Sequence, residues 1–282
     1  MKALIILAIF LSVNSNATIF GEDNRTDLVD VKNKEIVELS KSIPALVLKK
    51  FLKSKNEDEY TLDTSSYIED FGFCEDEKFV KKQSPLANCS AFLIGTNLVG
   101  TAAHCFDDSM NMGIDDYAVV FDYKAEANGA GPKTIKKENV YIIKKIVKQE
   151  FEWVTYKDYA VVELTKEVEG RAPLKISIGR RAPVGTELFI LGFPLGLPMK
   201  YQPSGTIISS DLNKNSFRHQ LDTYSVNSGS AVFSAESHEI VGIHVRGTGF
   251  NYKKDPNDKC NRWGKGDPAK DWGEANFIDL IL

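Results

Sequence analysis

The sequence lacks several features that would place it in a specialised class of protein. After residue 13, no apolar run approaches the roughly 20 residues that a transmembrane helix needs. It has no Cys-x-x-Cys pair, no low-complexity tract and no internal repeat. Lys and Arg number 35 against 39 Asp and Glu, a formal charge of −4, whereas a broad phosphate-binding face needs a basic excess. We therefore expect no membrane-spanning helix and no nucleic-acid partner.

What is present is an ordinary globular composition, with 43% apolar and 26% charged residues in a chain of 282. A chain of that length buries roughly three quarters of its unfolded surface, so it can hold a substantial core. It suits one two-lobed unit or two small domains.

The first 17 residues are typical of a secretory signal peptide. Lys2 provides a positive charge, and the run from Ala3 to Val13 is apolar except for Ser12. Ser15-Asn16-Ala17 then places small residues at the two positions that a signal peptidase reads. The apolar run is too short to cross a bilayer. We expect a mature chain that begins near Thr18 and a secreted or periplasmic protein.

Export decides how the four cysteines are interpreted, because an even number in an exported protein favours disulfides. Cys89 and Cys105 each border a short apolar run, which favours a bond between them. If these two pair, Cys74 and Cys260 pair by elimination. A zinc site is the alternative, but the spacing and the scarcity of histidines disfavour it, so we expect no metal.

From about Phe71 the chain consists of short runs rich in Val, Ile, Phe and Tyr, separated by Gly, Asn, Asp or Pro. This texture predicts many short strands in an all-β barrel or sandwich. The runs are residues 91–94, 117–121, 140–147, 159–164, 188–191, 206–208, 231–233 and 240–245. Residues 18–65 are more polar, with one amphipathic stretch at 32–53, and we expect either an inhibitory pro-segment or an arm around the barrels. The apolar tail 274–282 predicts a short docking helix.

Three short strings carry the residue types of nucleophilic catalysis. They are Thr101-Ala102-Ala103-His104-Cys105, then Asp158-Tyr159-Ala160, then Asn227-Ser228-Gly229-Ser230. Each is common by itself, because lone histidines are mostly structural and Asp, Gly and Ser are frequent in turns. Together, in the order His, Asp, Ser, they indicate a catalytic triad.

The strings resemble the triad motifs of the chymotrypsin-like (trypsin-like) serine peptidases, and in detail those of the bacterial glutamyl endopeptidases. The resemblance runs from about Cys74 to Gly247 and includes residues 89–94 and the loop 191–198. It implies an all-β fold of two six-stranded antiparallel β-barrels with a short C-terminal helix. The peptidase domain would span 66–282, with the first barrel to about 165 and the second at about 170–250. It also implies a bridge between Cys89 and Cys105.

The resemblance makes Ser228 the nucleophile, His104 the general base and acid, and Asp158 the orienting carboxylate. An imidazole with a pKa near 6.5 suits this task, and no cofactor is needed. The backbone N–H groups of Val226 and Ser228 would form the oxyanion hole. The family has glycine where this chain has Val226, and positive φ there costs about 1–3 kcal/mol. The alternative is a peptide that turns its carbonyl into the hole.

The resemblance also implies a primary specificity pocket. In glutamyl endopeptidases the residues that match Thr223 and His244 hold an acidic side chain, and both types can donate to a carboxylate. We expect Arg246 to add positive charge. Asp222 occupies the position of the pocket aspartate of trypsin, which favours Lys or Arg, but we favour cleavage after Glu or Asp.

Other polar residues receive structural interpretations. We interpret His219 and His238 as surface residues. The acidic stretch is a solvated loop rather than a calcium site, because its spacing is not that of an EF-hand. That stretch comprises Asp107, Asp108, Asp115 and Asp116. We expect Trp153, Tyr156 and Tyr159 to pack over Asp158.

The sequence thus predicts an exported, monomeric serine endopeptidase that hydrolyses protein or peptide substrates through an acyl-enzyme. The alternative is a catalytically impaired homologue that binds proteins or peptides through the same cleft, which Val226 favours. An esterase is a third interpretation, but the Gly-x-Ser-x-Gly elbow is absent because Val226 and Ser230 flank the serine.

Overall fold

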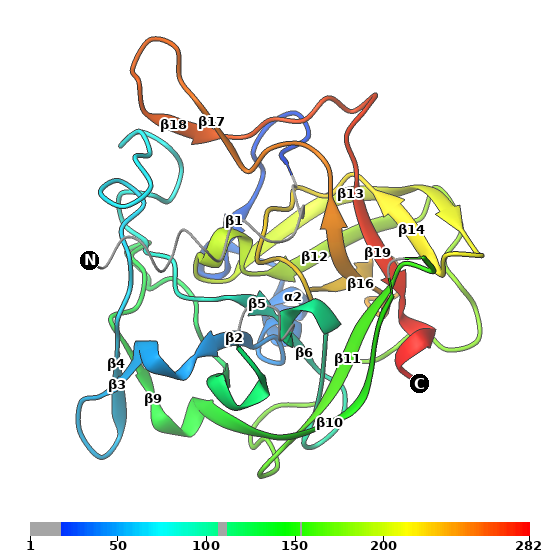
Figure 1. Cartoon of the computed structure of the whole chain (residues 1–282), viewed down its shortest axis with the longest axis horizontal. Helices are drawn as coiled ribbons and strands as arrows, with labels where there is room; N and C mark the ends of the chain where they lie inside the picture. The colour runs from blue at the N-terminus through cyan, green and yellow to red at the C-terminus, as the bar shows by residue number, and fades with distance from the viewer. Residues whose placement is uncertain (1–17, 107–111, 153) are drawn as a thin grey trace.

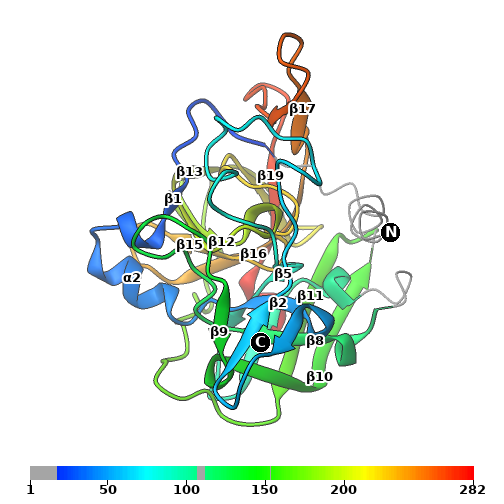
Figure 2. The ribbon, with the colours of Figure 1, turned by 90° about the vertical axis from the view of Figure 1, so that its left-hand side faces the viewer.

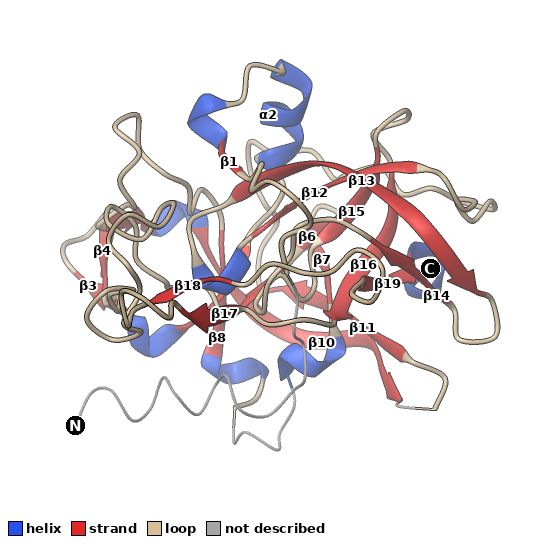
Figure 3. Ribbon diagram, turned by 90° about the horizontal axis from the view of Figure 1, so that it is seen from above, coloured by secondary structure: helices blue, strands red, loops and turns tan. Residues whose placement is uncertain are grey.

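The computed structural model describes residues 18–106, 112–152 and 154–282, and strands dominate them (Figure 3). The one α-helix in these ranges is α2 (Lys34–Ser40), capped by the Asn33 side chain, which accepts the Glu35 N–H. None of the helices in these ranges is long and apolar enough to cross a membrane. The expected signal peptide, Asp107, Asp108 and Trp153 lie outside the described residues.

The first barrel is nearly closed and has the strand order β5-β2-β8-β10-β11-β7-β6. Only Ala91 separates β5 from β6, so the two form one interrupted strand at the two edges of the sheet. The strands are β2 (Ala45–Leu48), β5 (Cys89–Ser90), β6 (Phe92–Leu93), β7 (Leu98–Thr101), β8 (Tyr117–Val120), β10 (Val140–Glu152) and β11 (Lys157–Leu164). β2 lies within the segment 18–65 and pairs with both β5 and β8.

The second barrel has the strand order β13-β12-β15-β16-β19-β14. It is closed, because its first and last strands, β13 and β14, also pair with each other. Its strands are β12 (Glu187–Gly192), β13 (Lys200–Asp211), β14 (Ser216–His219), β15 (Ala231–Ser234), β16 (Ile240–Gly247) and β19 (Gly273–Phe277). A further strand, β1 (Thr26–Asp27), pairs with β13 from outside. Figure 1 shows this barrel above the first one, with the C-terminal strand β19 in red between β16 and β14.

Two small sheets decorate the barrels. One contains β3 (Leu52–Ser54), β4 (Glu59–Leu62) and β9 (Thr134–Lys136), and the other is the hairpin of β17 (Tyr252–Lys254) and β18 (Asn261–Trp263). Figures 1 and 2 both show this hairpin projecting from the end of the second barrel. Short 3-10 turns such as η4 (Ala103–Phe106) and η8 (Pro194–Gly196) join the strands, and η9 (Ile278–Ile281) follows the last one.

The structure confirms the predicted double barrel, and every predicted apolar run overlaps a strand. The tail differs from the expectation, because residues 273–277 form β19 and only the last turn, η9, is helical. The reason is that β19 pairs with β14 on one side and with β16 on the other, so contacts distant in the sequence hold it as a strand. The last strand of the second barrel therefore lies beyond residue 250.

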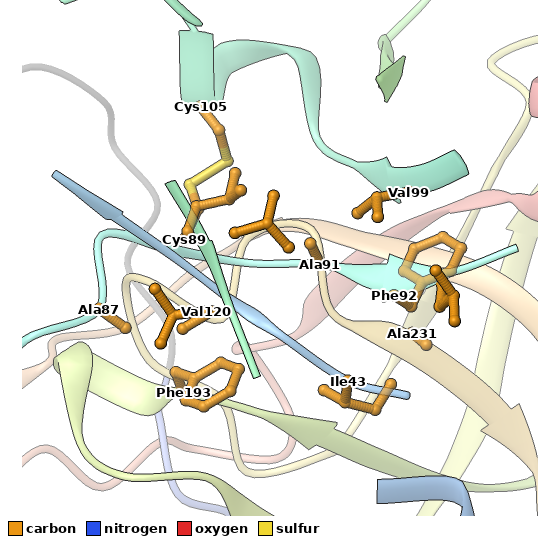
Figure 4. Packing of buried hydrophobic residues seen from close by; sticks show 14 of the residues in the cluster. Ile43, Ala87, Cys89, Ala91, Phe92, Val99, Cys105, Val120, Phe193 and Ala231 are labelled. Carbon is orange, nitrogen blue, oxygen red and sulfur yellow. A yellow bond between two sulfur atoms is a disulfide. The ribbon is translucent and has the colours of Figure 1, made fainter. Parts of the chain in front are cut away.

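Both predicted disulfides are present, Cys89–Cys105 and Cys74–Cys260. The first lies in a hydrophobic cluster that contains residues of both barrels. Figure 4 shows Cys89, Ala91 and Phe92 of the first barrel in the same cluster as Phe193 and Ala231 of the second. The two barrels therefore share a core where they meet. The second bridge joins the segment between β4 and β5 to the loop between β17 and β18.

Candidate active site

The register of β7 and β11 brings His104 to Asp158. Thr101 is opposite Ala160 in this antiparallel pair, so the chain leaving β7 passes the beginning of β11. His104 then lies on η4, with its Nδ1 2.6 Å from Asp158 Oδ2, and its backbone N–H donates to Asp158 Oδ1 across 3.0 Å. The carboxylate is 3% exposed. Two contacts to one buried carboxylate fix both the position of the histidine and its ring orientation.

The turn that carries Ser228 is pressed against the first barrel. The Ser90 N–H donates to the carbonyl of Ser228 across 2.8 Å, and Cys105 Sγ lies 3.9 Å from the same oxygen. Gly229 has φ of +82°, and a Cβ there would come within 2.2 Å of Thr101 Oγ1. Only glycine permits that approach. The serine of the second barrel is thereby brought beside the residue that adjoins His104.

The peptide between Ser225 and Val226 decides the state of the expected oxyanion hole. Val226 has φ of +75°, the strained value that the family assigns to glycine. The Ser225 carbonyl accepts the Leu195 N–H across 2.7 Å, so it is engaged by η8. In a trans peptide the N–H points away from the carbonyl, and so the Val226 N–H faces the other side. This is the orientation of an open hole rather than of a carbonyl turned into it.

His244 lies beside a histidine that the sequence did not assign to the pocket, and Thr223 is buried as well. The Thr223 side chain is buried, and its Oγ1 has no hydrogen-bond partner among the described residues. His244 Nδ1 lies 3.1 Å from His219 Nε2. The surface interpretation of His219 is wrong, because its side chain is fully buried and accepts the Leu221 N–H at Nδ1. Burial lowers the pKa of His219 to about 3 and holds that of His244 well below its usual value.

The two charged residues expected at the pocket are both occupied elsewhere. Asp222 is buried, and its Oδ1 accepts the Phe20 N–H across 2.7 Å. Burial raises the pKa of Asp222 to about 6. Arg246 pairs with Glu274 at 2.8 Å and donates to the Tyr156 carbonyl. A bulge in the pairing of β16 with β19 lies between His244 and Arg246.

Asn276 is a residue of the site that sequence reasoning missed. Its Oδ1 accepts the Asp158 N–H across 2.7 Å, and its Nδ2 donates to the Tyr156 carbonyl. It is fully buried in β19 of the second barrel. Glu274 and Asp279 lie close to it in the sequence, so no local pattern distinguishes this amide from an exposed one.

The remaining residues singled out in the sequence have ordinary surroundings in the fold. Tyr159 donates to Glu150 from β11, and His238 lies 2.9 Å from Glu35 of α2. Asp115 and Asp116 are exposed on a short turn. Cys89, His104 and Cys105 lie close enough to suggest a metal site, but both sulfurs are consumed by the disulfide.

Comparison with known proteins agrees with this geometry. The model of the trypsin-like peptidase domain matches residues 89–243, which is more than half of the chain. No curated protein matches the sequence. A solved Glu endopeptidase in complex with MPD superposes with a TM-score of 0.50 at 18% identity, over 89% of this chain and 95% of that one. The VesB protease of Vibrio cholerae superposes with a TM-score of 0.54 at 17% identity, over 92% of this chain and 66% of that one.

At these identities the two structures support the fold alone, and it is the family model that assigns the chain to a family. The chain therefore belongs to the trypsin-like peptidase family.

Proposed function

We propose that the protein is an exported serine endopeptidase that uses Ser228, His104 and Asp158, and cleaves after Glu or Asp. The observation that carries the proposal is the pairing of His104 with buried Asp158. Beside this pair lies the serine turn, in which the Ser225 carbonyl bonds to Leu195 and the Val226 N–H points the opposite way. These are the three requirements of acyl transfer: an oriented base, a nucleophile and a place for the oxyanion.

The chemistry follows the triad mechanism. Ser228 Oγ attacks the peptide carbonyl while His104 Nε2 takes its proton, and the carbonyl oxygen accumulates negative charge opposite the Val226 and Ser228 N–H groups. His104 then gives the proton to the leaving amine, and the acyl-enzyme forms. Water, deprotonated by the same histidine, attacks the ester and restores Ser228. Asp158 stabilises the imidazolium in both steps.

The histidine pair supports an acidic substrate side chain. The Leu221 backbone N–H can only donate, so His219 Nδ1 accepts and a neutral His219 carries its proton on Nε2. That proton is directed at His244 Nδ1, 3.1 Å away. A neutral His244 therefore carries its own proton on Nε2, which makes it a donor. With the Thr223 hydroxyl, it offers two donors to a carboxylate.

The same arrangement argues against a pocket for Lys or Arg. Asp222 is buried beneath residues 18–20, and its raised pKa disfavours the ionised form that a basic substrate would need. The pocket donors are neutral, because burial depresses the pKa of both histidines. Recognition of a Glu or Asp side chain would then rest on hydrogen bonds rather than on a fixed positive charge.

We further propose that residues 18–65 stay with the mature enzyme. β2 is a central strand of the first barrel, and β1 extends the second one. Asp27 forms a buried ion pair with Lys200 at 2.7 Å, and the buried Arg25 lies over the rings of Tyr224 and Trp263. The disulfides support an oxidising compartment. Intact mass and N-terminal sequencing of protein collected from the culture medium or periplasm test both statements: Thr18 should be the first residue.

The impaired homologue remains a second candidate because one observation favours it. A valine held at φ of +75° costs about 1–3 kcal/mol, and a glycine in its place would cost nothing. If that strain is relieved in solution by turning the 225–226 peptide, the hole closes and the protein binds peptides without cleaving them.

Labelling with a fluorophosphonate separates the two candidates. We expect the probe to modify Ser228 of the mature protein, located by peptide mass spectrometry, and not to label His104→Ala. Ser228→Ala is the matched control for probe specificity, because it removes only the oxygen. Absence of labelling in a folded wild-type protein would favour the homologue.

A panel of peptides that differ only at the residue before the scissile bond tests the specificity. We expect kcat/KM to be highest for Glu and Asp, and lower by roughly 100-fold or more for Gln, because Gln has an NH2 donor and no charge where the carboxylate has a second acceptor oxygen. Cleavage only after Lys or Arg would overturn the assignment and leave the serine chemistry intact.

A further inference from the structure

The carbonyl of the strained residue Val226 is held by a side chain from the other barrel. Ser90 Oγ lies 3.0 Å from Val226 O, and it also lies 3.2 Å from the Phe193 N–H. The N–H can only donate, so the hydroxyl accepts from Phe193 and directs its single proton at Val226. Ser90 is fully buried, which removes water as a competing partner.

Ser90 also holds Ser228, which lies two residues after Val226. Its backbone N–H donates to the Ser228 carbonyl across 2.8 Å. One residue of β5 is therefore bonded to the backbone at 226 and at 228, the two positions whose N–H groups form the proposed oxyanion hole. The two bonds differ in kind: the one to Ser228 uses the main chain and is available to any residue but proline, while the one to Val226 requires a hydroxyl.

Strained backbone persists only where its surroundings over-determine it. At Val226 two hydrogen bonds perform this task, one on each side of its Cα. The Leu195 N–H holds the preceding carbonyl, that of Ser225, and Ser90 Oγ holds the carbonyl of Val226 itself. With either bond absent, rotation about the bonds of residue 226 relieves the strain and moves the N–H that should face the substrate oxygen.

We infer that Ser90 is a positioning residue for catalysis: its hydroxyl keeps Val226 in a conformation that glycine would adopt unaided. The inference rests on the proposed function, and it explains how a chain with valine at this position keeps an open hole. The inference also implies that the effects of substitutions at residues 90 and 226 are coupled. The Ser90 hydroxyl should affect catalysis only while residue 226 is a strained valine.

The first test compares Ser90→Ala with Ser42→Ala. Ser42 is a fair control, because it is also buried and donates from Oγ to a backbone carbonyl, that of Ala172, at 2.7 Å. We expect Ser90→Ala to lower the rate constant for fluorophosphonate labelling by roughly 10- to 100-fold, while Ser42→Ala stays within about twofold of wild type. With a peptide substrate, kcat per titrated active site should fall and KM stay constant, because the hole acts on the transition state. Equal rates for the two variants would overturn the inference.

The second test is a double-mutant cycle with Val226→Gly. In the glycine background we expect Ser90→Ala to change the labelling rate by less than about threefold, since no strain remains to be held. A loss of the same size in both backgrounds would mean that the hydroxyl acts on general stability, and it would refute the coupling. Thermal unfolding of each variant shows whether the protein is folded at the assay temperature.

A crystal structure of Ser90→Ala provides a readout that does not depend on activity. We expect the Ser225 carbonyl to have left the Leu195 N–H. If wild-type protein is not labelled at all, the proposed function fails, yet comparison of the two crystal structures still decides this inference. An unmoved 225–226 peptide in the variant would overturn it.

Discussion

Replacing Asp222 by Asn tests the electrostatics of the buried carboxyl that bonds to the N-terminal segment. The carboxyl is 2% exposed, its Oδ1 accepts the Phe20 N–H, and Oδ2 has no hydrogen-bond partner among the described residues. Burial is the main cause that raises its pKa from 3.8 to about 6, and the Phe20 N–H and then the charge of Arg25 oppose it with smaller effects. Asparagine keeps an acceptor for Phe20 and removes the charge.

The sign of the effect follows from proton linkage. Below pH 3.8 the carboxyl is protonated in both states, so its burial costs no charge. Between pH 3.8 and about 6 the unfolded chain loses the proton first, and the folded state is progressively destabilised. Above that window the full difference applies, about 3 kcal/mol, since each tenfold change in proton affinity is worth about 1.4 kcal/mol. Asp222→Asn should therefore be more stable than wild type by about 3 kcal/mol at neutral pH, with the gain vanishing in acid.

Urea unfolding with the disulfides intact, at several pH values from about 3.5 to 8, measures this difference. Asp255→Asn is the control of opposite sign, because the side chain of Arg262 lowers the pKa of Asp255 to about 2. That variant should be less stable than wild type, with almost no change in the difference above about pH 4, because the two pKa values of Asp255 both lie below that pH. A gain for Asp222→Asn that is independent of pH would refute the reasoning, because it would mean that the pKa of Asp222 is the same in the folded and the unfolded state.

Three further changes have defined outcomes. Replacing Cys74 and Cys260 together by Ser should lower the free energy of unfolding by about 3–5 kcal/mol, because the bridge closes a sequence separation of 186 residues; an unchanged urea midpoint would contradict this. Asn276→Ala leaves the Asp158 N–H buried without its acceptor, so we expect a loss of about 1–3 kcal/mol in urea unfolding and a fall in kcat at constant KM, and normal turnover would argue against a role in the site. His219→Phe removes the group that orients the pocket histidine, so the preference for Glu over Gln in kcat/KM should drop by roughly tenfold, while labelling of the nucleophile stays unchanged; an unaltered preference would contradict the tautomer argument.

The sequence predicts most of the fold because its strands are locally encoded. The runs at 117–121 and 231–233 are rich in valine and phenylalanine and end at turn residues, and both lie in observed strands. β2 is different: all four of its residues are buried, so it has no alternation, and a short continuous apolar run does not distinguish strand from helix. β14 is not predicted because it has too few apolar residues: Phe217 is its one apolar residue, among Ser216, Arg218 and His219.

The triad positions are readable from the sequence because each lies in a string of fixed local form. The pocket is less readable because its members are defined by distant partners. His219 has the same local signal as a surface histidine, and only the pairing of β14 with β13 and β19 encloses it. At Arg246 the local pattern is misleading. Its spacing of two residues from His244 predicts that both side chains lie on one face of the strand, but a bulge that no sequence pattern indicates lies between them. Ser90 and Asn276 lacked a signal because each acts on backbone groups of another element.

These missed residues have a common property, which is that each spans the two barrels. Ser90 of the first barrel holds the serine turn of the second, and Asn276 of the second holds the Asp158 backbone of the first. The hydrophobic cluster at the junction likewise contains residues of both barrels. The catalytic geometry therefore depends on the interface and not on either barrel alone. A destabilisation confined to that interface should lower the rate of acylation, because the bonds that orient 158, 226 and 228 all cross it.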